Sequence, residues 1–121
     1  MADERVEAMK ALLHAAARDM PGLELETRHM FGGLAAYTRG RVFARVTGDG
    51  LGLKLAEVDQ RDLLAEEGAA HLRFESDGTS TRQYVRVPAH LLSPDALRPW
   101  IARSAQYVTA LPVSTRRRRR D

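Results

Sequence analysis

The sequence predicts an α+β domain in which an antiparallel sheet carries helices on one face. Apolar residues recur at three- and four-residue steps near both ends of the chain, and the period shifts towards two between them. Glycine-containing turns of the hairpin type separate the strand-like segments. The order α-β-β-β-α-β-β-α therefore predicts a two-layer sandwich with a five-stranded antiparallel sheet.

The first half of the chain contains a helix followed by a strand meander. Val6, Met9, Leu13 and Ala16 share one helical face, and Pro21-Gly22 ends that helix. The period of two then predicts three strands, at residues 30–38, 41–47 and 51–56. A short strand over residues 23–27 is an option ahead of them. The turns that separate the three strands are Arg39-Gly40 and Gly48-Asp49-Gly50.

The second half contains a short helix, a hairpin and a long helix. The short helix is expected over residues 58–67, and the hairpin strands over residues 71–75 and 81–87. Ser93, followed by Pro94, is typical of a helix start. Pro99 falls beyond the first turn, where proline removes a hydrogen bond, so we expect a kink or a restart there.

The positive charge of the chain is concentrated in its last nine residues. Residues 113–121 hold five Arg and one Asp and so contribute +4 to a formal net charge of +3, which leaves −1 on residues 1–112. We therefore predict one domain over residues 1–112 and a basic disordered tail over residues 113–121. The absence of Cys excludes disulfides and thiol catalysis. The lack of a signal-like or membrane-spanning stretch indicates a soluble cytoplasmic protein.

The stretch HMFGG at residues 29–33 raises the question of a phosphate-binding loop. Such a loop needs glycines between a strand and a helix N-terminus, where free backbone N–H groups converge on the anion. Here Gly32 and Gly33 lead into strand-like sequence instead. We interpret them as a bulge or a close backbone approach within the sheet.

Several motifs occur in an order that resembles the N-terminal domain of the TfoX/Sxy competence-regulator family. They are RHMFGG at 28–33, LAAY at 34–37, GRVFA at 40–44, LKL at 53–55 and YVRVP at 84–88, and the resemblance runs from about Met9 to Leu111. It implies a secretion-chaperone-like α/β sandwich without known catalytic residues. Longer members carry a C-terminal helical domain and regulate genes for DNA uptake. This chain stops before such a domain, so we do not expect a competence role to transfer directly.

Side chains suited to catalysis are scattered along the chain. The serines lack a nucleophile-elbow motif. Four histidines lack the spacings that are typical of zinc sites: His14, His29, His71 and His90. We therefore expect no enzyme activity, no metal and no cofactor.

Strand parity predicts a surface that mixes aromatic side chains with positive charge. If Val42, Ala44 and Val46 face the helices, their neighbours along the strand face away. The residues that parity places on the opposite face are Phe43, Arg45, Lys54, His71, Arg73, Tyr84 and Arg86. Arg28 and His29 are further candidates, because polar residues beside a bulge can point at a ligand. The alternative is an ordinary solvated sheet face.

Three functions are compatible with these features. The first is a non-enzymatic regulatory domain that binds an unidentified protein partner through this surface, with a homodimer as one form of that binding. The second is nucleic-acid binding by the tail arginines with help from the basic face, since such runs release counterions from phosphates. Those arginines are Arg116, Arg117, Arg118, Arg119 and Arg120. The third is a small-molecule enzyme of unknown class with a pocket near Arg28 and His29. We expect no membrane association.

Overall fold

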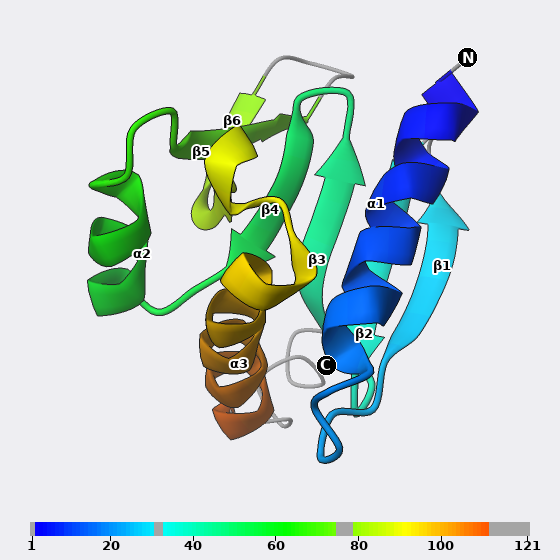
Figure 1. Ribbon diagram of the computed structural model, residues 1–121. Coiled ribbons are helices and arrows are strands. Elements are labelled where there is room, and N and C mark those ends of the chain that lie inside the picture. The colour runs from blue at the N-terminus through cyan, green and yellow to red at the C-terminus, as the bar shows by residue number, and fades with distance from the viewer. Residues whose placement is uncertain (1, 31–32, 75–78, 112–121) are drawn as a thin grey trace, which may run out of the picture.

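The computed structural model describes residues 2–30, 33–74 and 79–111, and it confirms the α+β fold (Figure 1). All strands pair antiparallel in one sheet of order β1-β2-β3-β4-β6-β5. The elements are α1 (Ala2–Ala17), β1 (Glu26–Met30), β2 (Gly33–Thr38), β3 (Arg41–Thr47), β4 (Gly50–Lys54), α2 (Glu57–Leu64), β5 (Ala70–Phe74), β6 (Thr79–Arg86), η1 (Ala89–Leu91) and α3 (Pro94–Ala110).

The sheet has six strands instead of the predicted five, because β1 is a full member. It pairs with β2 from Glu26 opposite Tyr37 to Met30 opposite Gly33. The sequence ETRHM of β1 contains one apolar residue and no alternation, so hydrophobic periodicity gives it no strand signal. Gly33 opens β2 and so leads into a strand and not into a helix, as the reading of HMFGG requires.

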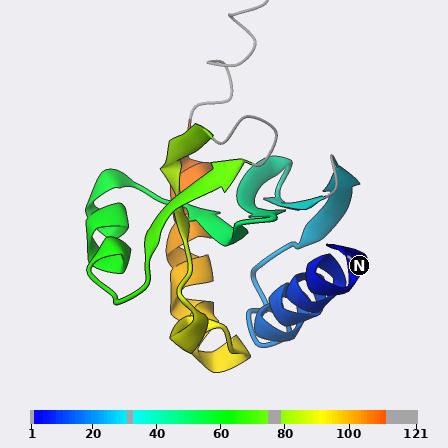
Figure 2. The ribbon, with the colours of Figure 1, turned by 90° about the horizontal axis from the view of Figure 1, so that it is seen from above.

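The helices lie on one face of the sheet. In Figures 1 and 2, α1 and α3 pack against that face, and residues of α2 reach the same core. Burial of apolar surface on this side supplies the main favourable term in folding. The fully buried large side chains of this core are Leu13, Leu34, Phe43, Val46, Leu51, Leu53, Leu55, Leu63, Val85, Leu97 and Ile101. In the part of the chain that the structure describes, no helix has the length and apolar character needed to cross a membrane.

Helix α3 is continuous, so the predicted restart at Pro99 is wrong. The Ser93 hydroxyl caps it by accepting a hydrogen bond from the Ala96 N–H at 3.3 Å, and Pro94 takes the first helical position, as predicted. Pro99 is exposed, while Leu97 and Ile101 on either side of it are fully buried. Packing of these neighbours against the sheet offsets the backbone hydrogen bond that proline removes.

A β-bulge in β3 changes which side chains reach the core. Ala36 pairs with Ala44 but Tyr37 pairs with Val42, so Phe43 is an extra residue in β3. In such a bulge the alternation of side chains is interrupted. Phe43 and Ala44 are both fully buried in the helix-side core, whereas Val42 is only half-buried and lies outside it. The prediction that Phe43 faces away from the helices is therefore wrong.

Candidate functional site

The sheet face opposite the helices carries a row of alternating arginines and small residues. Arg28 of β1 pairs with Ala35, Ala35 pairs with Arg45, Arg45 pairs with Gly52, and Gly52 pairs with Arg86. Directly paired residues extend their side chains from the same face of a sheet. We call this side the outer face and define it by six residues: Arg28, Tyr37, Arg45, Lys54, Tyr84 and Arg86.

Tyrosine rings lie between the basic groups of the outer face. Lys54 pairs with Tyr84 across β4 and β6. The Arg28 guanidinium carbon lies 5.2 Å from the centre of the Tyr37 ring, within the range of a cation–π contact. Burial raises the pKa of the Tyr84 hydroxyl, and the charge of Arg45 and its hydrogen bond to Tyr84 act in the opposite direction. The outer face therefore joins guanidinium and ammonium groups to aromatic surface, as the sequence predicts for four of its members.

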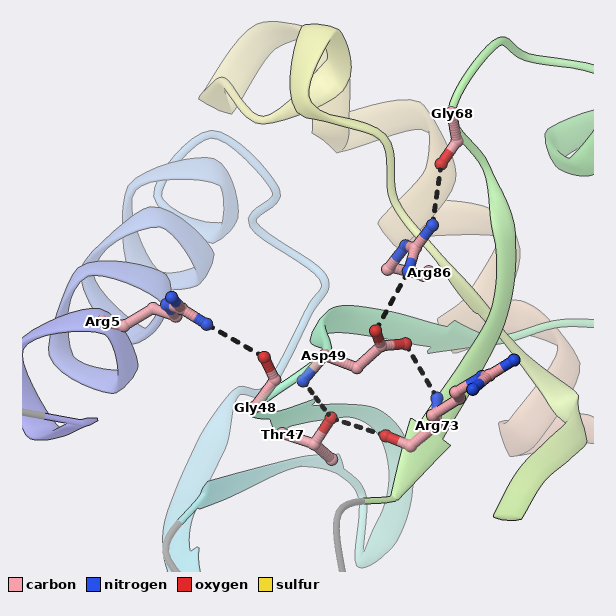
Figure 3. Close-up of polar contacts among 7 residues, drawn as sticks. All are labelled: Arg5, Thr47, Gly48, Asp49, Gly68, Arg73 and Arg86. Carbon is pink, nitrogen blue, oxygen red and sulfur yellow. Dashed lines mark hydrogen bonds and ion pairs between the residues drawn. The ribbon is translucent and has the colours of Figure 1, made fainter. Parts of the chain in front are cut away.

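Arg86 is held by a polar network that joins the β3–β4 turn to β5 and β6 (Figure 3). Its guanidinium donates to Asp49 Oδ1 at 3.0 Å and to the Gly68 carbonyl at 3.3 Å. The other Asp49 oxygen accepts from the Arg73 N–H at 3.0 Å, and the Thr47 hydroxyl donates to the Arg73 carbonyl at 2.8 Å. We call these contacts the Asp49 clip. They give Arg86 a structural role that the sequence reading missed, because Asp49 was interpreted only as a turn residue.

The structure separates Arg28 from His29. His29 pairs with Leu34 and so lies on the helix side of the sheet, where its Nε2 atom is 2.8 Å from Glu7 Oε2 of α1. His71 pairs with Val85 and also lies on the helix side. The structure thus does not place His29, Phe43 or His71 on the outer face, contrary to the sequence expectation for Phe43 and His71.

Arg28 is the most exposed basic residue of the outer face, with 62% of its side chain accessible against 33% for Arg86. Its guanidinium also pairs with Glu26 of the same strand at 3.0 Å. Arg45 and Lys54 are half-buried. A ligand arriving at this face would therefore meet Arg28 first.

Two sets of predicted residues lie outside the described part of the chain. These are the tail arginines at 116–120, and Phe31 with Gly32 of HMFGG. Among the residues that the structure does describe, no three His, Asp or Glu side chains are grouped closely enough to hold a metal ion.

Comparison with known proteins identifies one family. The model of the TfoX N-terminal domain matches residues 21–107, which is well over half of the chain. The matched span begins within the α1–β1 connection and ends in the last turn of α3, so α1 lies outside it although the motif resemblance begins near Met9. Searches of curated proteins and of solved structures gave no match.

Proposed function

Because the chain belongs to the TfoX N-terminal domain family, we propose that it is a regulatory domain that binds an acidic protein partner through the outer face. It acts by association and not by catalysis. A role in competence or transcription is the form of regulation that the family suggests, carried out here by the domain that the matched residues form. The cytoplasm is the compartment that fits such a role.

The observation that carries this proposal is the Arg-small-Arg row with tyrosines beside it. Arginine and tyrosine are enriched at protein interfaces, where they supply contact area at a low entropic cost and hydrogen bonds to carboxylates. Ala35 is fully buried, and the Leu72 side chain fills the space at Gly52, so a partner contacts the arginine and tyrosine side chains and not the strands beneath them. The contacts of Arg28 with Tyr37 and of Arg45 with Tyr84 hold these groups in place before a partner binds.

Reversal of charge on the outer face tests this proposal. Arg28→Glu combined with Lys54→Glu should abolish partner capture in affinity isolation from cells of the source organism, followed by quantitative mass spectrometry. These two positions lie outside the Asp49 clip, so the fold should persist, which circular dichroism checks. Arg18→Glu is the matched control, since Arg18 is exposed and its side chain makes no hydrogen bond or ion pair among the described residues. Equal capture by all three proteins would overturn the proposal.

Nucleic-acid binding is the second candidate, favoured by five consecutive arginines in the C-terminal segment. Each phosphate contact by such a tail releases counterions, so affinity falls steeply with salt. A salt titration with duplex and single-stranded DNA should show binding by the full chain that is lost when the chain ends at residue 112. Binding that survives the truncation but is lost in the Arg28→Glu, Lys54→Glu protein would assign nucleic acid to the outer face instead.

A further inference from the structure

A groove of about 620 Å³ lies on the helix side, between α2, the β5–β6 pair and the end of α3. One wall is a stripe of α2 at helical spacing, made of Glu57, Gln60, Arg61 and Leu64. The other walls come from three distant segments: His71 of β5, Gln83 of β6 and Tyr107 of α3. The volume falls in the range typical of small-molecule sites.

The charged residues of α2 divide into two groups. Those on the side towards α3 are paired, since Arg103 donates to Asp59 at 3.5 Å and to Asp62 at 3.3 Å. Glu57 and Arg61, which line the groove, make no side-chain ion pair or hydrogen bond with any residue that the structure describes. Residues four apart on a helix are neighbours, with Cβ atoms about 5–6 Å apart, so this site presents one negative and one positive side chain on the same helix face.

The uncharged polar side chains of the groove also have hydrogen-bonding groups without a partner among the described residues. The His71 ring lines the groove, and its Nδ1 atom is buried without a hydrogen-bond partner. Within the described ranges, the Gln83 amide and the Tyr107 hydroxyl make no side-chain hydrogen bond. Gln60 uses only its N–H₂ group, which donates to the Leu55 carbonyl at 2.8 Å. Gln83 is exposed and Tyr107 is half-buried, but a buried polar atom such as His71 Nδ1 normally finds a partner, so the groove points to a ligand.

We propose that the groove binds a short peptide with free termini, of two or three residues. The Arg61 guanidinium takes the peptide carboxylate and the Glu57 carboxylate takes its ammonium group. The amides of Gln60 and Gln83 and the His71 ring face the peptide bond between those charges, and Tyr107 and Leu64 provide apolar contact for a side chain. This site lies on the helix side of the sheet and is independent of the partner surface on the outer face.

A second hollow lacks this chemistry. It is a groove of about 440 Å³ between the α1–β1 connection and α3, lined by Met20, Pro21, Gly22, Leu23, Ala102 and Ala105 with Arg98 at one side. Arg98 already donates to the Ala16 carbonyl, Asp19 and Asp95. The Arg98 guanidinium is therefore already paired within the protein. The apolar side chains that line this groove give a peptide terminus no hydrogen-bond partner.

The test is a titration of the isotope-labelled full chain with trialanine, followed by the backbone amide resonances. The proposal predicts saturable shifts confined to residues 57–64, 71, 83 and 107, and none with acetylated, amidated trialanine, which lacks both terminal charges. Arg61→Gln and Glu57→Gln should each weaken binding by about tenfold, the loss expected for one charge-assisted hydrogen bond. The matched controls are Arg18→Gln and Glu67→Gln, which remove exposed charges elsewhere and should leave affinity unchanged.

Three results would overturn the proposal. They are an absence of saturable shifts at millimolar trialanine, equal shifts with the capped peptide, and shifts that the Arg61 and Glu57 substitutions do not weaken. In a separate titration, acetate or methylamine that binds with the affinity of trialanine would overturn the proposal too, because a lone carboxylate or amine would then be the ligand. If a peptide with a free C-terminus and an acetylated N-terminus shifts the α2 resonances as trialanine does, the site binds the C-terminus of a longer chain. The assignment of Glu57 to the peptide ammonium group is then wrong.

Discussion

Ser104 is a polar residue that is fully buried where α3 crosses the sheet. Its hydroxyl lies 2.9 Å from the Phe43 carbonyl of the bulge in β3 and 2.7 Å from the Lys54 carbonyl at the end of β4. A bulge leaves part of the strand ladder unpaired, and a buried carbonyl without a donor is costly. Ser104 thus lets one residue be inserted in β3, which in turn brings Phe43 into the core.

Removal of the Ser104 hydroxyl should destabilise the fold without changing its surface. Ser104→Ala removes the hydroxyl that contacts both carbonyls, and we expect a loss of about 1–3 kcal/mol in the free energy of unfolding. Urea unfolding followed by circular dichroism measures it. Thr109→Ala is the control, since the Thr109 hydroxyl donates only to carbonyls of its own helix. A loss for Ser104→Ala no larger than for the control would contradict this role.

At the scale of elements, the Asp49 clip fixes how the β5–β6 hairpin sits on the rest of the sheet. Asp49 lies 37 residues before Arg86 in the chain, and its carboxylate joins Arg86 of β6 to the Arg73 backbone of β5. From the other side, Arg5 of α1 donates to the Gly48 carbonyl at 2.9 Å, so the same turn also contacts the N-terminal helix (Figure 3). The turn between β3 and β4 therefore also contacts α1, β5 and β6.

The clip predicts a measurable coupling between Asp49 and Arg86. The two side chains are 21% and 33% exposed, so solvent screens their interaction only in part. A double-mutant cycle with Asp49→Ala and Arg86→Ala should give a coupling energy of about 1–2 kcal/mol in urea unfolding. The exposed pair Glu26 and Arg28, at 59% and 62%, is the comparison, and its cycle should give less than about 0.5 kcal/mol. Equal coupling energies for the two pairs would contradict a structural role of the Asp49 clip.

The parts of the fold that the sequence predicts are those with local signals. The period of the helices, the Ser93 cap and the Arg39-Gly40 turn depend on neighbouring residues, and Arg39 and Gly40 do adopt the positive φ values, 54° and 79°, that a tight hairpin needs. Parity also placed Arg45, Lys54, Tyr84 and Arg86 on one face. Parity assigned Phe43 to the wrong face, because the local sequence of β3 contains no signal of the one-residue bulge that shifts the strand register.

The features that the sequence does not predict depend on contacts between distant segments of the chain. The Asp49 clip, the cation–π contact of Arg28 with Tyr37 and the groove beside α2 each join residues that no spacing rule connects. The strand β1 is another example, because its pairing with β2 comes from backbone hydrogen bonds and not from an apolar pattern.

For the whole molecule, the sheet separates two surfaces of different chemistry. The helix side holds the core and the α2 groove, whose exposed charges are one acid and one base. The outer face carries four basic side chains around two tyrosines. The two proposals therefore place a macromolecular partner and a small ligand on opposite sides of the sheet, and neither proposed site requires the other.

The measurement that tests the partner surface most directly is photo-cross-linking in living cells. A benzophenone amino acid is placed at Tyr37, on the outer face, or at Val58, which is 61% exposed on α2. We predict a discrete adduct with a second protein from position 37 and none from position 58, with the position 37 adduct lost when Arg28→Glu and Lys54→Glu are added. An adduct from position 58 alone, or none from position 37, would contradict binding through the outer face.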